Sequence, residues 1–153
     1  MKLISELLDG RPRVTLPPHT TALAASRAMT DFQVGAVLVV DADGTPLGIF
    51  TERDLMTRVI VAGLDPSRTL IERVMSRDVY CVSPERKLVE TAREMQSRHI
   101  RHLPVIANQR FLGMLSLRDV LRELLNDKTR EVEELTAYIQ ATEIPDENRD
   151  SSC

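Results

Sequence analysis

Along the chain, hydrophobic and polar residues alternate as in β-strands in some segments and recur as in α-helices in others. These segments follow each other in the same order in the two halves of the chain. Short extended stretches at residues 13–16 and 79–82 lead to Pro18 and Pro84, and apolar residues then recur at intervals near three and four. A β-rich run, a turn, a returning strand and another helical segment follow in each half. The pattern therefore predicts two β-α-β-β-α units.

The predicted elements occupy matching places in the two units. The first helices carry apolar residues at helical spacing, namely Leu23, Met29 and Phe32 in the first unit and Val89, Ala92 and Met95 in the second. Strand pairs and closing helices are predicted at residues 35–41, 47–50 and 51–63, and at 101–106, 112–115 and 116–125. Residues 1–8 and 70–78 are predicted to form a lead-in helix before each unit.

The two units are copies of one sequence pattern. At an offset of 66 residues, the aligned pairs are Pro18 with Pro84, Arg27 with Arg93, Met29 with Met95 and Val39 with Val105. At an offset of 65, they are Leu47 with Leu112, Gly48 with Gly113, Arg53 with Arg118 and Asp54 with Asp119. The change of offset falls in a predicted turn, where length changes are tolerated. The chain is therefore predicted to be a duplication.

The duplication predicts how the chain is organised. A unit of about sixty residues buries a core poorly alone, so we expect the two repeats to pack on each other in pseudo-two-fold fashion. The predicted fold class is α/β (α+β), with a helix added at the C-terminus. The predicted domains are residues 1–66 for the first repeat and its lead-in, 67–126 for the second repeat, 127–142 for the C-terminal helix and 143–153 for a flexible tail.

The C-terminal extension has an apolar stripe at helical intervals. Its members are Leu121, Leu125, Val132, Leu135 and Ile139, and Lys128 interrupts them. Such a stripe suits a helix that packs on the repeats or on a second chain. We expect a homodimer, and packing of the helix on its own chain is the alternative.

Composition and charge narrow the classes of function. The chain has 153 residues, a net charge of −3, three Phe, two Tyr and no Trp, which argues against a nucleic-acid partner. No apolar run is long enough to cross a bilayer, and the acidic Glu6 does not suit a signal peptide, so no membrane partner and a cytoplasmic location are expected. Cys81 and Cys153 predict neither a disulfide nor a zinc site.

The closing helix of each repeat starts with a hydroxyl residue and an acid three positions later. These are Thr51 with Asp54, and Ser116 with Asp119. One interpretation is a capping box, in which each side chain satisfies a backbone N–H group of the helix end. The other is a binding site, because a carboxylate at a cleft mouth accepts hydrogen bonds from the two hydroxyls of a ribose. Capping and binding are compatible.

Sequence motifs in both copies resemble those of a known family. The first copy reads G-A-V-L-V-V-D and then G-x-x-T-x-x-D, and the second reads V-M-S-R-D-V, I-R-H-L-P-V and G-x-x-S-x-x-D. Over residues 3–126 this order resembles a tandem pair of CBS domains, the Bateman module, of the stand-alone bacterial type. From the residues alone, Gly48 and Gly113 are predicted to let a strand approach its neighbour closely.

The resemblance implies a regulatory module that binds an adenosine-containing ligand in the cleft between the repeats. AMP, ADP or ATP would be the ligand, with NADH or S-adenosylmethionine as further candidates, and no metal is required. Asp54 and Asp119 would hold ribose, with Thr51 and Ser116 beside them. The adenine would meet Ile49 and Met114. The strands that complete each adenine pocket would supply residues that are equally well explained as ordinary core, namely Val14, Thr15, Leu16, Tyr80, Cys81 and Val82.

The most informative difference between the repeats is that Gly35-Ala36 of the first is replaced by Arg101-His102 of the second. Charge patterning alone is equally consistent with a solvated basic turn. The resemblance implies that Arg101 and His102 meet phosphate, although they stand in the reverse of the family's frequent His-Arg order, so either is a candidate for the main contact. Arg53 and Arg118 precede the two aspartates and would reach phosphate or form ion pairs. We therefore expect the site of Ser116 and Asp119 to bind phosphorylated ligands better.

Two classes of function stay open at this point. The first is a non-catalytic sensor that changes conformation or dimer arrangement when a ligand binds. The alternative is a structural module for dimerisation or partner docking, with an empty or vestigial cleft. An enzyme is not expected, because the sequence offers neither a nucleophile with its base nor a metal-ligand set around His99 and His102.

Overall fold

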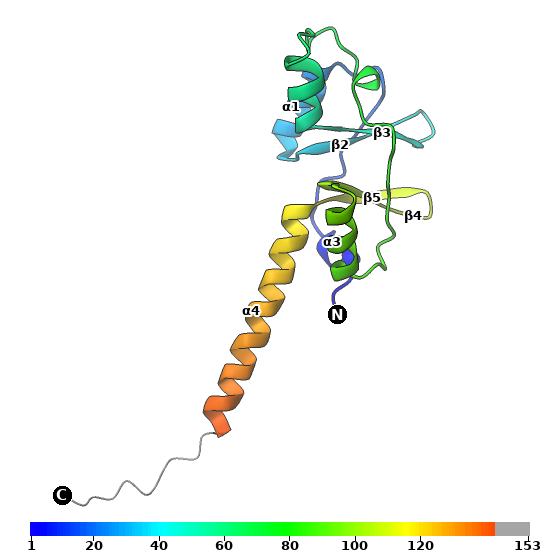
Figure 1. Cartoon of the computed structure of the whole chain (residues 1–153). Helices are drawn as coiled ribbons and strands as arrows, with labels where there is room; N and C mark the ends of the chain where they lie inside the picture. Colours follow the sequence, from blue (N-terminus) through cyan, green and yellow to red (C-terminus); the bar gives the residue numbers. More distant parts are fainter. Residues whose placement is uncertain (143–153) are drawn as a thin grey trace, which may run out of the picture.

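In the computed structural model residues 1–142 are described, and they form two small α+β halves that face each other and one long helix that leads away from them (Figure 1). The strands are β1 (Thr15–Leu16), β2 (Ala36–Val40), β3 (Pro46–Thr51), β4 (His102–Ala107) and β5 (Arg110–Ser116). The α-helices are α1 (Ala22–Phe32), α2 (Glu52–Asp54), α3 (Leu88–Ser97) and α4 (Leu117–Thr142). Short 3-10 turns form η1 (Ile4–Leu7) and η3 (Ile71–Arg73), and η2 (Leu55–Ile60) is a π-helix.

The two halves repeat one sheet topology, and this confirms the predicted mixed α and β class. In the first half, β1 runs parallel to β2, and β2 pairs antiparallel with β3. In the second half, β4 pairs antiparallel with β5. The strand predicted at residues 79–82 is reduced there to a single parallel bridge between Val82 and Val105, the counterpart of the β1–β2 pairing.

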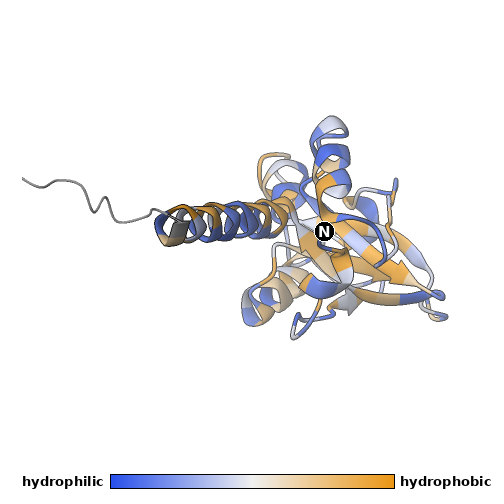
Figure 2. Cartoon of the chain, turned by 90° about the horizontal axis from the view of Figure 1, so that it is seen from below, coloured by the Kyte–Doolittle hydropathy of each residue, from blue (hydrophilic) through white to orange (hydrophobic). Residues whose placement is uncertain are grey.

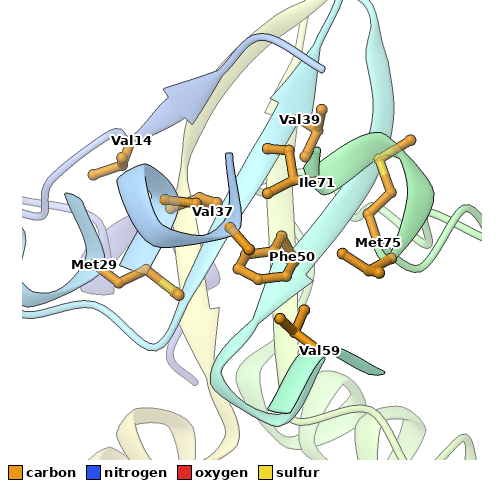
Figure 3. Close-up of a cluster of buried hydrophobic side chains, with 11 residues drawn as sticks. Val14, Met29, Val37, Val39, Phe50, Val59, Ile71 and Met75 are labelled. Carbon is orange, nitrogen blue, oxygen red and sulfur yellow. The ribbon is translucent and has the colours of Figure 1, made fainter. Parts of the chain in front are cut away.

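Each half has its own apolar core. In the first, Val37, Val39 and Phe50 are fully buried between the sheet and the helices (Figure 3). These residues alternate with inter-repeat positions along β2 and β3, as strands that are buried on both faces require. The core is completed by Ile71 and Met75, which come from the lead-in of the second repeat.

The lead-in segments are exchanged between the halves. Ile4 is fully buried in the core of the second half, and its backbone N–H donates to the carbonyl of Arg86 at 3.0 Å. Ile71 is fully buried in the first half, and its N–H donates to the carbonyl of Thr20 at 2.9 Å. Figure 1 shows the N-terminal segment beside α3. Each structural half therefore contains the lead-in of the other repeat.

A third apolar cluster lies between the halves and joins them. Ala36, Leu38 and Ile49 of the first sheet are buried in it, and Phe111 and Met114 of β5 pack against them. The expected packing of the two repeats on each other is therefore observed.

Gly48 has the close neighbour that the sequence predicted. A Cβ atom at this position would lie 2.5 Å from Sδ of Met75 and 2.8 Å from the carbonyl oxygen of Ser76. Ser76 and Ile49 exchange two backbone hydrogen bonds of 2.9 Å at this point. Only a residue without a side chain lets the lead-in segment pair with β3 so closely.

Several helices differ from their predicted form. The segment 51–63 is a short α2 followed by the π-helix η2, and the segment 70–78 keeps only the three residues of η3. Phe32 and Val89, which the helical spacing grouped with apolar neighbours, are 54% and 39% exposed. The predicted helices at 116–125 and 127–142 form one uninterrupted α4. The flexible tail predicted at 143–153 lies outside the described residues.

Candidate functional site

Two cavities lie between the repeats, and each contains one of the predicted acidic residues. The larger cavity, of about 950 Å³, is lined by Ser116 and Asp119 together with residues 33–36 of the first half. The smaller cavity, of about 490 Å³, is lined by Thr51 and Asp54 together with residues 99–102 of the second half. Both carboxylates therefore lie at the groove between the halves.

At the smaller cavity, the predicted capping box is formed. The backbone N–H of Thr51 donates to Oδ2 of Asp54 at 3.0 Å, and the N–H of Asp54 donates to Oγ1 of Thr51 at 3.2 Å. The other oxygen, Oδ1, lies 3.5 Å from Oγ of Ser76 and 3.5 Å from Nε of Arg58. Asp54 is only 6% exposed, so its carboxylate is engaged by the protein itself.

Asp119 at the larger cavity is held differently. Its backbone N–H donates to Oγ of Ser116 at 3.1 Å, and the Ser116 hydroxyl donates to Oδ2 at 2.6 Å. Nη1 of Arg11 donates to the same oxygen at 2.6 Å, so both side-chain bonds meet at Oδ2. The Asp119 side chain is 24% exposed, against 9% for Asp54. Asp119 is the more accessible of the two carboxylates.

The ionisation of Asp119 follows from these contacts. Partial burial raises the pKa of the carboxyl, but the hydrogen bonds from Arg11 and Ser116 and the charge of Arg11 outweigh it. The pKa of Asp119 is therefore lowered, and the group is an anion at neutral pH.

Arg101 and His102 stand at the boundary between the cavities and line both of them. His102 is the first residue of β4 and lies opposite Ser116 in the strand register. A Cβ atom on Gly35 would lie 2.9 Å from Nε2 of His102. The difference between Gly35-Ala36 and Arg101-His102 therefore has a steric reason, because His102 occupies the space that a side chain at position 35 would need.

His102 is a neutral hydrogen-bonding group rather than a cation. Burial lowers the pKa of its imidazole, the carboxylates of Glu52 and Asp119 act in the opposite direction, and the charge of Arg101 adds to the lowering. The pKa stays below its ordinary value, so the fixed positive charge at this boundary belongs to Arg101.

The two cavities differ in charge. The larger is lined by four arginines and two carboxylates, which are Arg11, Arg101, Arg118 and Arg122 with Glu52 and Asp119. The smaller is lined by three of each, which are Arg53, Arg58 and Arg101 with Glu52, Asp54 and Asp78. The larger cavity therefore has the excess of positive charge that suits an anionic group.

The remaining predicted residues fall into two sets. Ile49 lines the smaller cavity and Met114 the larger, and both belong to the apolar cluster between the halves. Of the strand residues that were predicted to complete the adenine pockets, Tyr80 lines the smaller cavity, whereas Val14, Thr15, Leu16, Cys81 and Val82 line neither cavity. Val82 is buried in the second core, and burial raises the pKa of the half-buried Cys81 thiol. Their role in binding stays a prediction.

Arg11 is the main residue that the sequence analysis missed. It reaches Asp119 from the lead-in segment, 108 positions away in the chain. The offset of 66 residues pairs Arg11 with Arg77, and this repetition was the available signal. Charge alone did not single it out, because the chain has 20 lysines and arginines.

The fold defines a paired α+β module with two clefts between its repeats. A family model for the CBS domain matches residues 4–61 and 71–126. The chain therefore belongs to the CBS-domain family and contains a tandem pair of these domains. CBS-domain pairs are regulatory modules and are generally non-catalytic.

Known proteins and solved structures agree with this assignment. The chain is 35% identical over 124 residues to the mitochondrial CBS domain-containing protein CBSX3 of Arabidopsis thaliana, covering 78% of this chain and 60% of that relative. The CBS-domain containing protein ATU1752 from Agrobacterium tumefaciens is 33% identical with a TM-score of 0.73, over 80% of this chain and 98% of that one. The chain thus spans less than two thirds of the plant relative's length.

A third comparison concerns a structure with bound ligands. The CBS domain pair of protein MJ0100, in complex with 5-methylthioadenosine and S-adenosyl-L-methionine, has a TM-score of 0.73 over 83% of this chain and 98% of that one. At 21% identity, this likeness concerns the fold. Among residues 1–142, no helix is both long and apolar enough to span a bilayer, and no three His, Cys, Asp or Glu side chains are grouped around a possible metal position.

Proposed function

We propose that this CBS pair is a sensor that binds a phosphorylated, adenosine-containing ligand in the larger cavity. One observation carries the proposal. Asp119, the more accessible carboxylate, lies in the cleft between the repeats beside an excess of arginine side chains. A carboxylate that accepts from a ribose diol, next to guanidinium groups that donate to phosphate, matches the two polar parts of a nucleotide.

Each site residue has a role in this proposal. Asp119 accepts hydrogen bonds from the ribose, and Ser116 orients its carboxylate. Met114 meets the adenine from β5. Arg101 and Arg118 donate to phosphate, and the neutral His102 contributes a hydrogen bond.

The smaller cavity is proposed to bind such ligands more weakly. Its Asp54 already completes a capping box, and its arginines are matched by carboxylates. Binding of ribose there would replace bonds that stabilise the start of α2. Ile49, Thr51 and Arg53 are the residues through which a second ligand would be held.

Regulation follows from the position of the site between two separately packed halves. A ligand that contacts residues 33–36 of the first repeat and Asp119 of the second shifts the chain toward the arrangement that it binds best. The fold neighbour with bound 5-methylthioadenosine and S-adenosyl-L-methionine supports an adenosine-containing ligand for this type of cleft.

Thermal unfolding with AMP, ADP, ATP, NADH and S-adenosylmethionine tests the proposal. A ligand at a hundred times its Kd adds about 2.7 kcal/mol, which raises Tm by about 5 °C or more. We expect the largest increase with an adenine nucleotide, loss of the increase in Asp119→Ala, and no loss in Asp43→Ala, whose side chain is exposed in the β2–β3 turn. Absence of any increase at millimolar ligand would instead support the structural module.

The alternative of a dimerisation or docking module has one specific observation in its favour. Helix α4 carries exposed apolar residues, among them Leu125, Val132 and Leu135, at 60–67% exposure. Figure 2 shows apolar positions recurring along this helix. We propose that this stripe joins two chains in a homodimer, which is compatible with ligand binding in the cleft.

A further inference from the structure

The N-terminal segment is tied to α4 by a row of acidic residues. Asp119, Glu123 and Asp127 follow each other at intervals of four and therefore share one face of the helix. Lys2 pairs with Glu123, and its Nζ lies 3.0 Å from Oδ1 of Asp127. Arg11 pairs with Asp119 at 2.6 Å. Two cations of the lead-in thus meet the same face that carries the proposed ribose contact.

The two attachments lie in different backbone surroundings. Around Lys2, the backbone is fixed by hydrogen bonds of 3.0 Å from Ile4 N–H to the Arg86 carbonyl and from Leu88 N–H to the Lys2 carbonyl. Arg11 follows Gly10, which has a positive φ of 71° and open space around it. Within its own segment, Nε of Arg11 donates to the carbonyl oxygen of Leu7 at 2.5 Å and its backbone N–H to that of Leu8 at 3.2 Å. The bond to Asp119 joins two side chains, so its exchange leaves the backbone pairing near Ile4 in place.

Arg11 occupies an oxygen that a ribose would need. Its Nη1 and the Ser116 hydroxyl both donate to Oδ2 of Asp119, each at 2.6 Å. A ribose hydroxyl that donates to this oxygen competes with the guanidinium. Because Arg11 lines the same cavity as Arg101 and Arg118, a displaced guanidinium stays within the region proposed for phosphate.

We propose that Arg11 is an internal counter-ion that releases Asp119 to the ribose and moves to the phosphate of the same ligand. This inference rests on the proposed function of the larger cavity and names its regulation. Binding thereby transfers Arg11 from α4 to the ligand and frees the segment between η1 and β1 from the helix. Ligand binding in the cleft thus changes the contact between the lead-in segment and α4 through the exchange of one ion pair.

At the smaller cavity the acidic residue is paired with an arginine of the same helical segment and not with one from a lead-in. Nε of Arg58 lies 3.5 Å from Oδ1 of Asp54, and Nη1 of Arg58 donates to the carbonyl oxygen of Met75 at 3.0 Å. Arg77, the counterpart of Arg11, donates to the carbonyl oxygen of Glu72 at 2.9 Å and is exposed. Asp54 is held by its capping box instead. The exchange therefore belongs to the larger cavity.

The exchange predicts selectivity for phosphate over bare nucleoside. A ligand whose ribose donates to Oδ2 of Asp119 displaces Arg11, and only a phosphate on that ligand gives Arg11 a new partner. Adenosine loses the contact without replacement. AMP is therefore favoured over adenosine by Arg11, in addition to the contributions of Arg101 and Arg118.

Calorimetric titration of the full chain with AMP and adenosine tests this selectivity. In Arg11→Ala we expect tighter adenosine binding and a fall of about tenfold or more in the preference for AMP, the effect of one charge-assisted hydrogen bond. Arg11→Lys keeps a charge and retains part of the preference. Arg13→Ala, two residues away and exposed, leaves both affinities unchanged. Equal weakening of both ligands in Arg11→Ala, or an unchanged ratio of their affinities, overturns the exchange.

A measurement without ligand separates this inference from the proposed function. In NMR titrations of the free protein, Arg11→Ala should raise the pKa of Asp119, because the guanidinium favours the carboxylate form. An unchanged Asp119 titration overturns the ion pair whatever the chain binds. A raised pKa, together with no binding of AMP or adenosine by the unaltered protein, overturns the proposed function and the exchange with it, and leaves the ion pair as a structural link.

Discussion

At the scale of single residues, Gly35 and His102 show how a duplicated sequence becomes asymmetric. The offset of 66 residues aligns Gly35 with Arg101 and Ala36 with His102, and in the folded chain Gly35 lies against His102 of the other repeat. The space beside Gly35 is filled by the His102 ring, at 2.9 Å from where a Cβ would stand. Two large side chains cannot share this space, so one repeat carries a small residue and the other an imidazole.

Gly35→Ala should therefore destabilise the protein by about 1 kcal/mol, at the low end of the effect of overpacking, because the end of the His102 side chain must shift. Because the contact is with the end of the His102 side chain, His102→Ala should recover most of this loss in the double variant. Urea unfolding of the four proteins of this cycle measures the coupling. If the effects of the two substitutions on the free energy of unfolding are additive, Gly35 and His102 do not interact as described.

The pH dependence of stability should carry the signature of His102. Burial lowers the pKa of its ring in the folded protein, against the opposing effects of Glu52 and Asp119. The unfolded chain therefore takes up a proton first, and stability that is complete above about pH 6.5 is lost as the pH falls toward the folded-state pKa. The slope from one group is at most about 1.4 kcal/mol per pH unit. Unfolding of His102→Gln between pH 7.5 and 5 should show a flatter profile, and the exposed His19→Gln should not.

Residues of the candidate site were predictable where their neighbours in sequence determine their geometry. The spacing from Thr51 to Asp54 predicts a capping box because both groups belong to one helical turn, and the box is formed. The contact between Arg11 and Asp119 depends on how a lead-in crosses to the other repeat. No local spacing records that crossing, and the sequence therefore did not reveal it.

At the scale of elements, the exchanged lead-in segments explain why some predicted helices are short. The segment 70–78 pairs its backbone with β3 at Ile49 and Ser76, which a continuous helix would prevent. The apolar residues of this segment are buried, as their spacing predicts, but they pack into the core of the other repeat. By contrast, α4 continues without interruption through Lys128 as one helix of 26 residues.

Hydrogen exchange of two matched variants tests the crossing. Ile4→Ala and Ile71→Ala each remove a fully buried side chain, at a cost of about 2–5 kcal/mol. Ile4→Ala should speed the exchange of amides at Val105 and Leu115 in the second half more than at Val37 and Phe50. Ile71→Ala should show the reverse preference. Faster exchange in each variant's own sequence repeat would contradict the crossing.

At the scale of the whole molecule, α4 gives the chain a second surface, distinct from the cleft. The helix has 26 residues, or about 39 Å, and much of it projects from the two sheets (Figure 1). Leu121, Leu125, Val132 and Leu135 recur on it at intervals of four, seven and three, and Lys128 falls within the longest interval. This spacing is typical of a two-stranded coiled coil with one polar core position.

Sedimentation of a charged variant tests whether the stripe joins two chains. Val132→Glu combined with Leu135→Glu should shift the protein from dimer to monomer, because two carboxylates would be buried at the centre of the contact. Val89→Glu, a similar change of an exposed apolar residue on α3, should leave the dimer intact. A doubly substituted chain that sediments as before would place the dimer contact elsewhere.

The crossing of the lead-in segments also suggests how such a chain arises. An ancestral gene coding for one repeat would produce a protein whose lead-in segment packs into the apolar core of a second subunit. The lead-in of the second subunit would pack into the core of the first. Two copies would then assemble as an interlocked pair, and gene fusion would need only the short link around residues 62–70 to make them one polypeptide. Once the two copies were covalently joined, their sequences would no longer have to be identical. The aligned positions at the centre could then carry Gly35-Ala36 in one repeat and Arg101-His102 in the other.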